Sequence, residues 1–480
     1  MDLNTSLSLT APEAVLSFSS LALLLIAAWR TESGRLLSIL AVAALIGAGA
    51  LTASFLCAGT QASAFNGLYS NDAFGNFAKL LIYFAAAVSL MIAPRYLDRI
   101  ASLRAEYPVL ILLAVVGMGI MVSATDLLTL YIGLELNSLA AYVLASFARK
   151  DGRSAEAGLK YFVLGALASG ILLFGMSLIY GFTGTTSFEA IGAVLKGEIN
   201  LGLIFGIVFM LSGLAFKISA APFHMWTPDV YEGAPTPVSA FFASAPKVAA
   251  TALLMRVVVT AFGAQVMVWQ QIVMVVALMS IIIGAVGAIG QQNLKRLLAY
   301  SSINNVGFIL IGLAAGTVDG IAAMFVYLAI YVAMTLGGFI CLMQLRGADG
   351  ALKEGLADVA GLSKTRPELA LALAIFMFSL AGIPPLFGFW GKLVVFNAAV
   401  AAGLLPLAVI GIAASVVGAF YYLKVIKLMY FDEPQTEIVD AGAPELSWLA
   451  ALLALMVSPL GYLAIPLLGG WASVAARALF

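Results

Sequence analysis

Apolar runs of about 20 residues recur along the whole chain, separated by short hydrophilic connections. A helix of that length crosses the roughly 30 Å of hydrocarbon in a bilayer. The chain is 63% hydrophobic and 10% charged, whereas a soluble domain is about 45–50% apolar and about 25% charged. No stretch alternates with period two between turns, so the pattern is not that of a β-barrel. The sequence predicts an all-α polytopic membrane protein.

We predict about fourteen transmembrane helices in one membrane domain, 1–480, because the longest connections (182–200, 346–366 and 431–445) are too short to fold separately. The predicted spans are 12–29, 36–57, 71–93, 107–124, 126–147, 156–181, 201–221, 236–261, 267–290, 294–313, 318–345, 367–397, 403–430 and 446–468.

The basic residues are distributed unevenly between the two predicted faces. Seventeen of the 24 Lys and Arg residues fall in alternate connections on one face, and only Lys196, Arg256 and Arg477 fall on the other. Cytoplasmic connections carry the excess of Lys and Arg. We therefore predict that both termini lie on the non-cytoplasmic side. The remaining four basic residues fall inside spans: Lys79, Lys217, Lys247 and Lys392.

Two apolar segments contain helix-breaking sequences. Gly382-Ile383-Pro384-Pro385 interrupts the span 367–397, and the segment from Lys217 to Pro237 contains four prolines. Irregular backbone at membrane depth is tolerated only where it is buried in protein or lines a cavity. Paired interruptions in corresponding positions are typical of transporters built from repeats around a transport site.

Two short similarities suggest that the chain contains such a repeat. Phe223–Trp226 is similar to Phe387–Trp390, and Tyr131–Asn137 is similar to Tyr300–Val306. Chance similarity between apolar segments is the alternative. Because each repeat would contain five spans, an odd number, the second would be inverted relative to the first. The predicted parts are helices 1–3 (about 12–93), repeat one (about 107–261), repeat two (about 267–430) and a last helix (about 446–468).

Four charged residues, Glu135, Lys217, Lys247 and Lys392, lie deep within apolar stretches. Each costs roughly 2.5–3.5 kcal/mol at the bilayer centre if it has no partner. The functional interpretation is a path for protons, since burial disfavours the charged form of lysine and eases proton exchange. The alternatives are static ion pairs or side chains that reach back to an interface.

Three further residues are weaker candidates. His224 lies in the first break, where it could relay protons or satisfy freed carbonyl groups. Lys160 and Lys295 lie near the cytoplasmic ends of their spans, where basic residues more often determine topology than take part in chemistry. Lys79 is less deep and could reach an interface.

The chain itself shows no sign of a redox centre, a metal site or a nucleotide site. It has one histidine, which excludes bis-histidine haem ligation, and two distant cysteines, Cys57 and Cys341, that read as small buried apolar side chains. No glycine-rich phosphate loop follows a strand pattern. No cofactor and no nucleic acid is expected to bind this chain.

Four motifs resemble the antiporter-like membrane subunits of respiratory complex I. They are Phe216–Lys247, Tyr131–Leu144, Leu294–Phe308 and Ser379–Lys392. Within the first motif, the sequence TPDVYEGAPTP is most similar to that of N-type subunits of bacterial NADH–quinone oxidoreductase. Lys392 stands where M-type subunits would carry glutamate, and the sequence has no long lateral helix of the L type.

The resemblance implies that Glu135 and Lys217 form a charge pair and that protons pass by Lys247 to Lys392. It implies coupling to NADH oxidation and quinone reduction in partner subunits, which would hold the FMN and iron–sulfur clusters. Expected neighbours are the lipid bilayer, an M-type subunit and small K- and J-type subunits. The expected location is the bacterial inner (plasma) membrane, with both termini periplasmic.

Two other classes of protein share some of these features. A subunit of a multi-subunit cation/proton antiporter would have the same fold and the same buried Lys and Glu residues. A purely structural membrane scaffold would hold the charges in static pairs. The sequence TPDVYEGAPTP favours complex I over the antiporter. The four charges within apolar segments and the two broken helices argue against a structural scaffold.

Overall fold

The computed structural model describes residues 3–30, 33–197, 199–348, 350–440 and 442–480. The predicted connections near 30–35, 182–200, 346–366 and 431–445 each include one or two residues outside these ranges.

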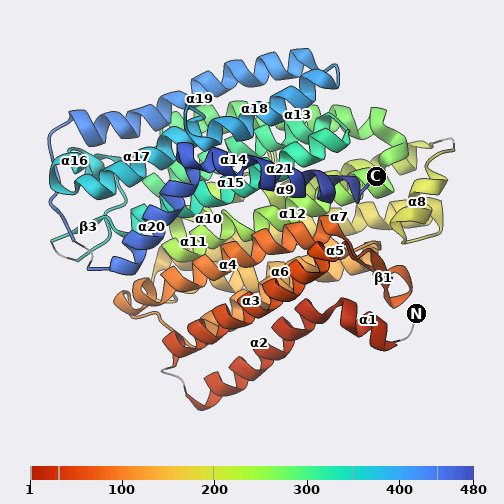
Figure 1. Cartoon of the computed structure of the whole chain (residues 1–480), viewed down its shortest axis with the longest axis horizontal. Helices are drawn as coiled ribbons and strands as arrows, with labels where there is room; N and C mark the ends of the chain where they lie inside the picture. Colours follow the sequence, from red (N-terminus) through yellow and green to blue (C-terminus); the bar gives the residue numbers. More distant parts are fainter. Residues whose placement is uncertain (1–2, 31–32, 198, 349, 441) are drawn as a thin grey trace. The chain divides into compact units, whose positions relative to one another are not determined.

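Helices make up most of the described chain (Figure 1). The first twelve are α1 (Leu3–Leu9), α2 (Ala11–Trp29), α3 (Gly34–Cys57), α4 (Ala73–Arg99), α5 (Glu106–Ser123), α6 (Leu127–Ala145), α7 (Gly152–Thr183), α8 (Phe188–Val194), α9 (Leu201–Ile218), α10 (Trp226–Gly233), α11 (Thr236–Phe242) and α12 (Ala245–Arg256). They are followed by α13 (Val266–Ile289), α14 (Leu294–Ala314), α15 (Val318–Met343), α16 (Leu362–Thr365), α17 (Pro367–Ala381), α18 (Phe387–Ala401), α19 (Leu405–Phe431), α20 (Pro444–Val457) and α21 (Ile465–Arg477).

Short elements join these helices. The 3-10 turns are η1 (Phe65–Gly67), η3 (Gly263–Gln265), η4 (Leu356–Val359) and η5 (Pro459–Ala464), and η2 (Val257–Ala261) is a π-helical turn. Strands β1 (Ala62–Ala64) and β2 (Tyr69–Asn71) form an antiparallel hairpin, and β3 (Arg346–Gly347) pairs antiparallel with β4 (Ile438–Val439). In the hairpin, Ala62 lies opposite Asn71.

Polar residues at the helix starts explain several boundaries. The side chains of Asp72, Asp126 and Asp151 accept hydrogen bonds from the first turns of α4, α6 and α7. Asn293 does the same for α14. Each satisfies backbone donors that the helix leaves free, so an apolar run begins as a helix directly after the acidic or amide residue.

Among the described residues, twelve helices are long and apolar enough to cross a membrane. Three other predicted spans correspond to shorter apolar helices: α9, the pair α17 and α18, and α20. The last predicted span, 446–468, is not one helix, because α20 ends at Val457 and η5 and α21 follow. The total of fourteen spans stays a prediction.

Both predicted helix breaks are present. Helix α9 ends at Ile218, and the following prolines divide the next segment into α10, α11 and α12. Helix α17 ends at Ala381 with Gly382 in the left-handed conformation, and α18 begins at Phe387. The peptide bonds Ala221–Pro222 and Pro384–Pro385 are cis.

The chain forms two compact units. The first contains Met1–Ile218, Ala245–Val273 and Trp471–Phe480, and the second contains Ser219–Ser244 and Met274–Gly470. The chain thus leaves the first unit and returns to it within the first interrupted segment. The single membrane domain and the two five-helix repeats stay predictions.

Helices pack closely within each unit. In the first unit, α2, α3 and α4 lie side by side (Figure 1), α5 packs on α6, α7 packs on α9, and α12 contacts α4, α5 and α9. In the second unit, α15 packs against α14, α17, α18 and α20.

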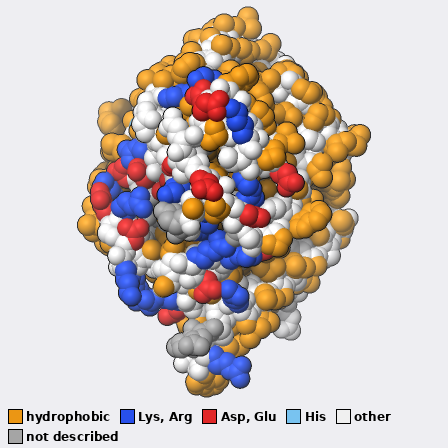
Figure 2. All heavy atoms as spheres, turned by 90° about the vertical axis from the view of Figure 1, so that its left-hand side faces the viewer, with side chains coloured by type: hydrophobic (Ala, Val, Ile, Leu, Met, Phe, Trp, Pro, Cys, Tyr) orange, Lys and Arg blue, Asp and Glu red, His pale blue; other side chains and the backbone are white. Residues whose placement is uncertain are grey.

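Charged and apolar side chains occupy different parts of the surface. Figure 2 looks onto a face where Lys, Arg, Asp and Glu side chains gather, with hydrophobic side chains around them. Exposed ion pairs such as Arg35–Asp98 and Lys364–Glu433 lie at helix ends or in connections. Large apolar side chains such as Phe18, Leu167 and Val416 are exposed along helices α2, α7 and α19. This distribution is typical of a multi-pass membrane protein.

Candidate proton-transfer site

Lys217 lies at the C-terminal end of α9, one residue before the first break. Its Nζ atom donates to the hydroxyl of Ser138 on α6 at 2.7 Å and to that of Ser169 on α7 at 3.4 Å. The ring centroid of Tyr142 lies 5.9 Å from Nζ. Helices α6 and α7 of the first unit therefore surround the ammonium group of Lys217 on α9 with hydroxyl oxygen atoms and an aromatic face.

Glu135 lies on α6, one turn before Ser138. Its carboxylate is near enough for its charge to act on Lys217. Among the described residues, however, the two form no ion pair, and the buried Oε1 atom of Glu135 has no hydrogen-bond partner. The two predicted partners are neighbours, but in this structure the ammonium is bonded to Ser138 and Ser169.

Glycines bring α5 and α6 close enough to fix the position of Glu135. A Cβ atom on Gly117 would lie 2.6 Å from the backbone nitrogen of Asn137, and one on Gly133 would lie 2.9 Å from the carbonyl oxygen of Gly117. Contacts this short to backbone atoms cannot be relieved by turning a side chain. Only glycine allows this approach.

A third glycine positions the aromatic neighbour of Lys217. A Cβ atom on Gly165 of α7 would lie 2.2 Å from the hydroxyl oxygen of Tyr142. The ring of Tyr142 therefore packs against α7 where a larger residue would displace it. This contact sets the aromatic wall beside Lys217.

Lys247 is the third residue of α12 and is buried. Its Nζ atom donates to the carbonyl oxygen of Ile218, the last residue of α9, at 3.1 Å. The final carbonyl groups of a helix lack intrahelical partners and favour a cation. Lys217 and Lys247 therefore meet at the same interrupted helix end, although 30 positions separate them in the chain.

Lys392 makes the corresponding contact in the second unit. It lies on α18, and its Nζ atom donates to the carbonyl oxygen of Ala381, the last residue of α17, at 2.8 Å. A second bond of 3.0 Å goes to the hydroxyl of Ser415, and the ring centroid of Phe308 lies 4.5 Å away. In both units a buried lysine thus caps the helix that ends at the break.

The three weaker candidates differ in their surroundings. His224 lies between α9 and α10, and its Nδ1 atom has no hydrogen-bond partner among the described residues. Lys160 pairs with Glu156 at 2.6 Å on the exposed face of α7. Lys295 is buried, donates to the carbonyl oxygen of Ala234 at 2.7 Å, and pairs with Glu354 at 3.4 Å. Of the two lysines, only Lys295 has an internal position.

The structure also reveals buried charges that the sequence interpretation missed or misplaced. Arg256, which the sequence assigns to the non-cytoplasmic face, is buried at the end of α12 and forms a bidentate pair with Asp72 at 2.8 and 2.9 Å. Lys79 does not reach an interface, because it is buried and pairs with Glu13 at 2.7 Å. The usable signals were Asp72 directly before an apolar run and Glu13 at the start of one.

No group of three or more His, Cys, Asp or Glu side chains suited to a metal ion occurs in the described parts of the chain. The chemistry that this arrangement supports is proton exchange by buried lysine and carboxylate groups. Such groups in a membrane interior mark ion pathways and proton relays.

Comparison with known proteins first defines the class. Residues 124–418 match the family described as "NADH:quinone oxidoreductase/Mrp antiporter, TM". This stretch contains all four predicted proton-path residues and both interrupted segments. The match thus places the chain in a class of membrane subunits that includes those of NADH:quinone oxidoreductase and of the Mrp antiporter.

The full-length relatives are more specific. NADH-quinone oxidoreductase subunit N of Erythrobacter litoralis is 61% identical, over 100% of this chain and 99% of the relative. That of Rhizorhabdus wittichii is 62% identical over 100% of both chains. The chain therefore belongs to the family of NADH-quinone oxidoreductase subunit N, which confirms the resemblance seen in its motifs.

Solved structures agree with this assignment. A chain of respiratory complex I from Thermus thermophilus is 33% identical with a TM-score of 0.81, covering 97% of this chain and 99% of that chain. A chain of the Mrp complex from a Dietzia species has a TM-score of 0.85 at 23% identity, covering 98% of this chain and 97% of that chain, and shows the shared fold alone. The predicted all-α antiporter-like membrane fold is confirmed.

Proposed function

We propose that this chain is the proton-translocating membrane subunit of an NADH:quinone oxidoreductase. The observation that carries the proposal is the pair of interrupted helices whose ends are held by buried lysines, Lys247 on Ile218 and Lys392 on Ala381. NADH oxidation and quinone reduction occur in partner subunits, which hold the FMN and iron–sulfur clusters. This chain contributes proton transfer.

The first step is a change of partner by Lys217. Its ammonium is bonded to Ser138, and Glu135 lies one turn away on the same helix, a rise of about 4.5 Å. Beside Glu135 the charged form of Lys217 is stabilised by the carboxylate, whereas on the serine hydroxyls it has only neutral acceptors. A small movement of α6 against α9 therefore controls whether Lys217 keeps or releases its proton.

The released proton passes next to Lys247 and then to Lys392. Lys217 and Lys247 both lie at the end of α9, so the first transfer needs no long path. The interruption leaves carbonyl groups that hold an ammonium or a water molecule. Lys392 receives the proton at the second helix end. His224 and Lys295 take part in the proton path beside the first break, whereas Lys160 helps to set the orientation of the chain in the membrane.

The proposed setting is the bacterial inner membrane, with both termini on the periplasmic side. The proposed neighbours are an M-type antiporter-like subunit and the small K- and J-type subunits. The charge pair between Glu135 and Lys217 belongs to the state in which Lys217 is protonated and α6 has moved towards it.

The test is the substitution Lys217→Ala in the assembled complex, reconstituted into vesicles. We expect normal assembly and less proton translocation per NADH oxidised, because the first proton carrier is missing. The exposed Lys150→Ala serves as the matched control and should behave as the natural chain. Unchanged proton translocation per NADH in the Lys217→Ala variant would contradict the proposal.

The alternative, a subunit of a cation/proton antiporter, is tested by separating native complexes from membranes in mild detergent. Comigration of this chain with NADH dehydrogenase activity supports the oxidoreductase. Migration in a smaller assembly without that activity supports the antiporter.

A further inference from the structure

A second group of buried ionisable side chains lies in the first unit, on helices that the proposed proton path does not use. Lys79 of α4 pairs with Glu13 of α2, with 2.7 Å between Nζ and Oε1. Tyr69 of β2 donates to Oε2 of Glu13 at 2.9 Å and accepts a bond of 2.6 Å from Lys79. The side chains of Lys79 and Glu13 are 1% and 8% exposed.

Stability alone is a weak explanation for this cluster. Moving two charges out of water costs about as much as their attraction returns, and apolar residues of similar size in their place are often neutral or stabilising. Either charge alone would be costly in a membrane helix. A buried pair that stability does not require is a candidate for function.

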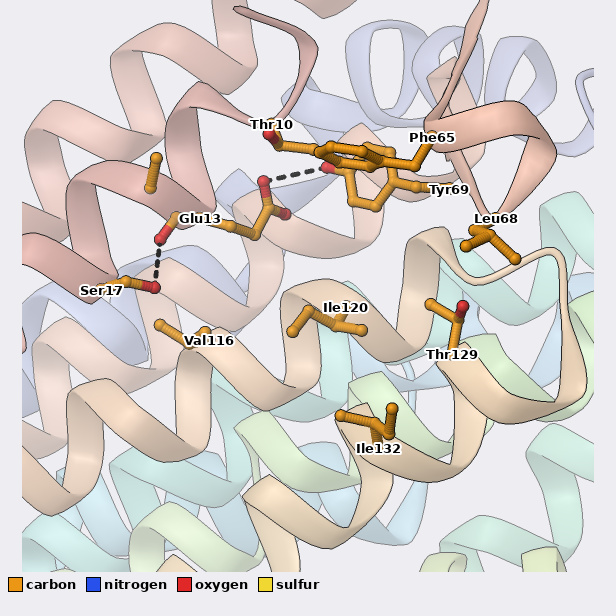
Figure 3. A pocket seen from close by; sticks show the side chains of 11 residues that line it. Thr10, Glu13, Ser17, Phe65, Leu68, Tyr69, Val116, Ile120, Thr129 and Ile132 are labelled. Carbon is orange, nitrogen blue, oxygen red and sulfur yellow. Dashed lines mark hydrogen bonds between the residues drawn. The ribbon is translucent and has the colours of Figure 1, made fainter. Parts of the chain in front are cut away.

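A cavity of about 360 Å³ adjoins the carboxylate side of this cluster (Figure 3). Its wall includes Glu13, three hydroxyl groups besides that of Tyr69, and apolar side chains of α5 and α6. The hydroxyl-bearing residues are Thr10, Ser17 and Thr129. Water occupies about 30 Å³ per molecule and needs polar partners. The cavity has room for several molecules, and although most of its exposed lining is apolar, the Glu13 carboxylate and the hydroxyl groups at its edge are polar partners for water. Lys79 does not line the cavity, so Glu13 stands between the lysine and the cavity.

The opposite wall of the cavity leads to the proposed proton path. Thr129 and Ile132 of α6 line it, and in Figure 3 they face Glu13 from across the pocket. Glu135 and Ser138 follow at the same spacing of three residues. Residues three apart are neighbours on a helix surface, so Glu135 lies one turn beyond the cavity wall at Ile132. Ser138, nine residues after Thr129, faces the opposite side of α6, where it holds Lys217. Glu135 therefore lies between the cavity side of α6 and the side that contacts Lys217.

We propose that Glu13 is a proton-exchanging residue and that the cavity beside it is a port between Glu135 and water on the non-cytoplasmic side. The proposal rests on the proposed function. A proton leaves the Glu135 carboxyl group, crosses the cavity on water and is taken up by the Glu13 carboxylate, which later releases it to outside water. Lys79 stays protonated throughout and keeps Glu13 ionised between transfers, and Tyr69 orients its carboxylate.

The test uses the complete complex in vesicles, with proton translocation and NADH oxidation measured together. Glu13→Gln is expected to translocate less than about half as many protons per NADH, since loss of a positioned proton-transfer group slows the transfer it served. Glu13→Gln with Lys79→Met replaces the ion pair by a neutral one and should show the same loss with normal assembly. Exposed Glu106→Gln is the matched control and should be unchanged.

The outcomes separate the port from the proposed function. Normal translocation by the neutral double variant, together with a loss in Lys217→Ala, would overturn the port alone. Normal translocation by both would overturn the proposed function as well. Because the variants could fail to assemble, the natural complex is also treated with a hydrophobic carbodiimide, which reacts with protonated carboxyl groups. Glu13 is protonated only while it carries a proton, so the reaction is compared with and without NADH turnover. Modification of Glu13 during turnover supports the port, and its absence during turnover, where another membrane carboxyl group is modified, contradicts it.

Discussion

At the scale of single residues, the buried cations Lys79, Lys217, Lys247, Arg256, Lys295 and Lys392 each lie beside a specific partner. Lysines at the interrupted helices bond to carbonyl and hydroxyl oxygens, which leaves them free to give up a proton. Asp72 and Arg256 differ, because they form a bidentate pair and Arg256 also donates to the carbonyl oxygen of Val122. This arrangement suits a permanent connection between helices more than proton exchange.

Asp72→Ala is expected to destabilise the folded chain by about 3–5 kcal/mol, because it leaves the buried guanidinium of Arg256 without its partner. It also removes the side chain that caps α4. The measurement is the midpoint of thermal unfolding of the purified complex. Asp98→Ala removes an exposed pair with Arg35 and should change stability by about 0–1 kcal/mol.

The same pair has a defined pH dependence. Burial acts to raise the pKa of Asp72, but the adjacent Arg256 outweighs it, so the pKa lies below its ordinary value of about 3.9. The stabilisation is therefore complete above the unfolded value and is lost as pH falls through the folded one. The difference between the natural chain and Asp72→Ala should stay constant from about pH 5 to about pH 8. A difference that changes within that window would contradict this account.

At the scale of helices, glycine positions decide how closely the elements of the site approach. Gly117 and Gly133 allow the backbones of α5 and α6 to approach closely. Gly382 ends α17 and lies against the side chain of Lys392. The sequence predicted the helix breaks, because proline and glycine act on their own local backbone. It did not predict the close packing of α5 on α6. The sequence of an apolar run does not show which helix will pack against its glycines.

Gly117→Ala is expected to reduce stability by about 1–3 kcal/mol through overpacking, and to reduce proton translocation by displacing α6 and Glu135. Gly170→Ala on α7 is the matched control, since its Cβ atom would meet nothing within 4 Å. The control should be neutral or slightly stabilising, because alanine favours a helix over glycine. Equal behaviour of the two variants in unfolding and translocation assays would contradict the packing explanation.

Gly382→Ala is expected to impair proton translocation more than Gly403→Ala. Both glycines have positive φ, 80° and 78°, so the backbone strain is matched. Only at Gly382 would the new Cβ atom meet Lys392, 2.7 Å from its Cδ atom, whereas nothing lies within 4 Å at Gly403. The comparison of translocation per NADH therefore isolates displacement of Lys392. A similar loss in both variants would attribute the effect to strain alone.

At the scale of the whole molecule, composition and periodic apolar runs predict a multi-pass membrane protein of the antiporter-like class, and the family comparisons confirm it. Two of the four motifs, Phe216–Lys247 and Ser379–Lys392, contain the helix breaks, and the other two lie in the unbroken helices α6 and α14. The number of spans and the inverted repeats stay predictions. They depend on how short helices such as α9 and α20 lie in a bilayer, and helix length alone does not decide that.

The sequence by itself determined the membrane class and the positions of the helix breaks, and it identified Glu135, Lys217, Lys247 and Lys392 as charges within apolar segments. Each of these follows from the hydropathy or backbone chemistry of a short segment. Only the tertiary structure decided which side chains form the hydrogen bonds and ion pairs of these charged residues. Lys217 and Ser138 are 79 positions apart, and Asp72 and Arg256 are 184 apart. No local pattern encodes such contacts, because they exist only once the helices have packed and brought distant side chains together.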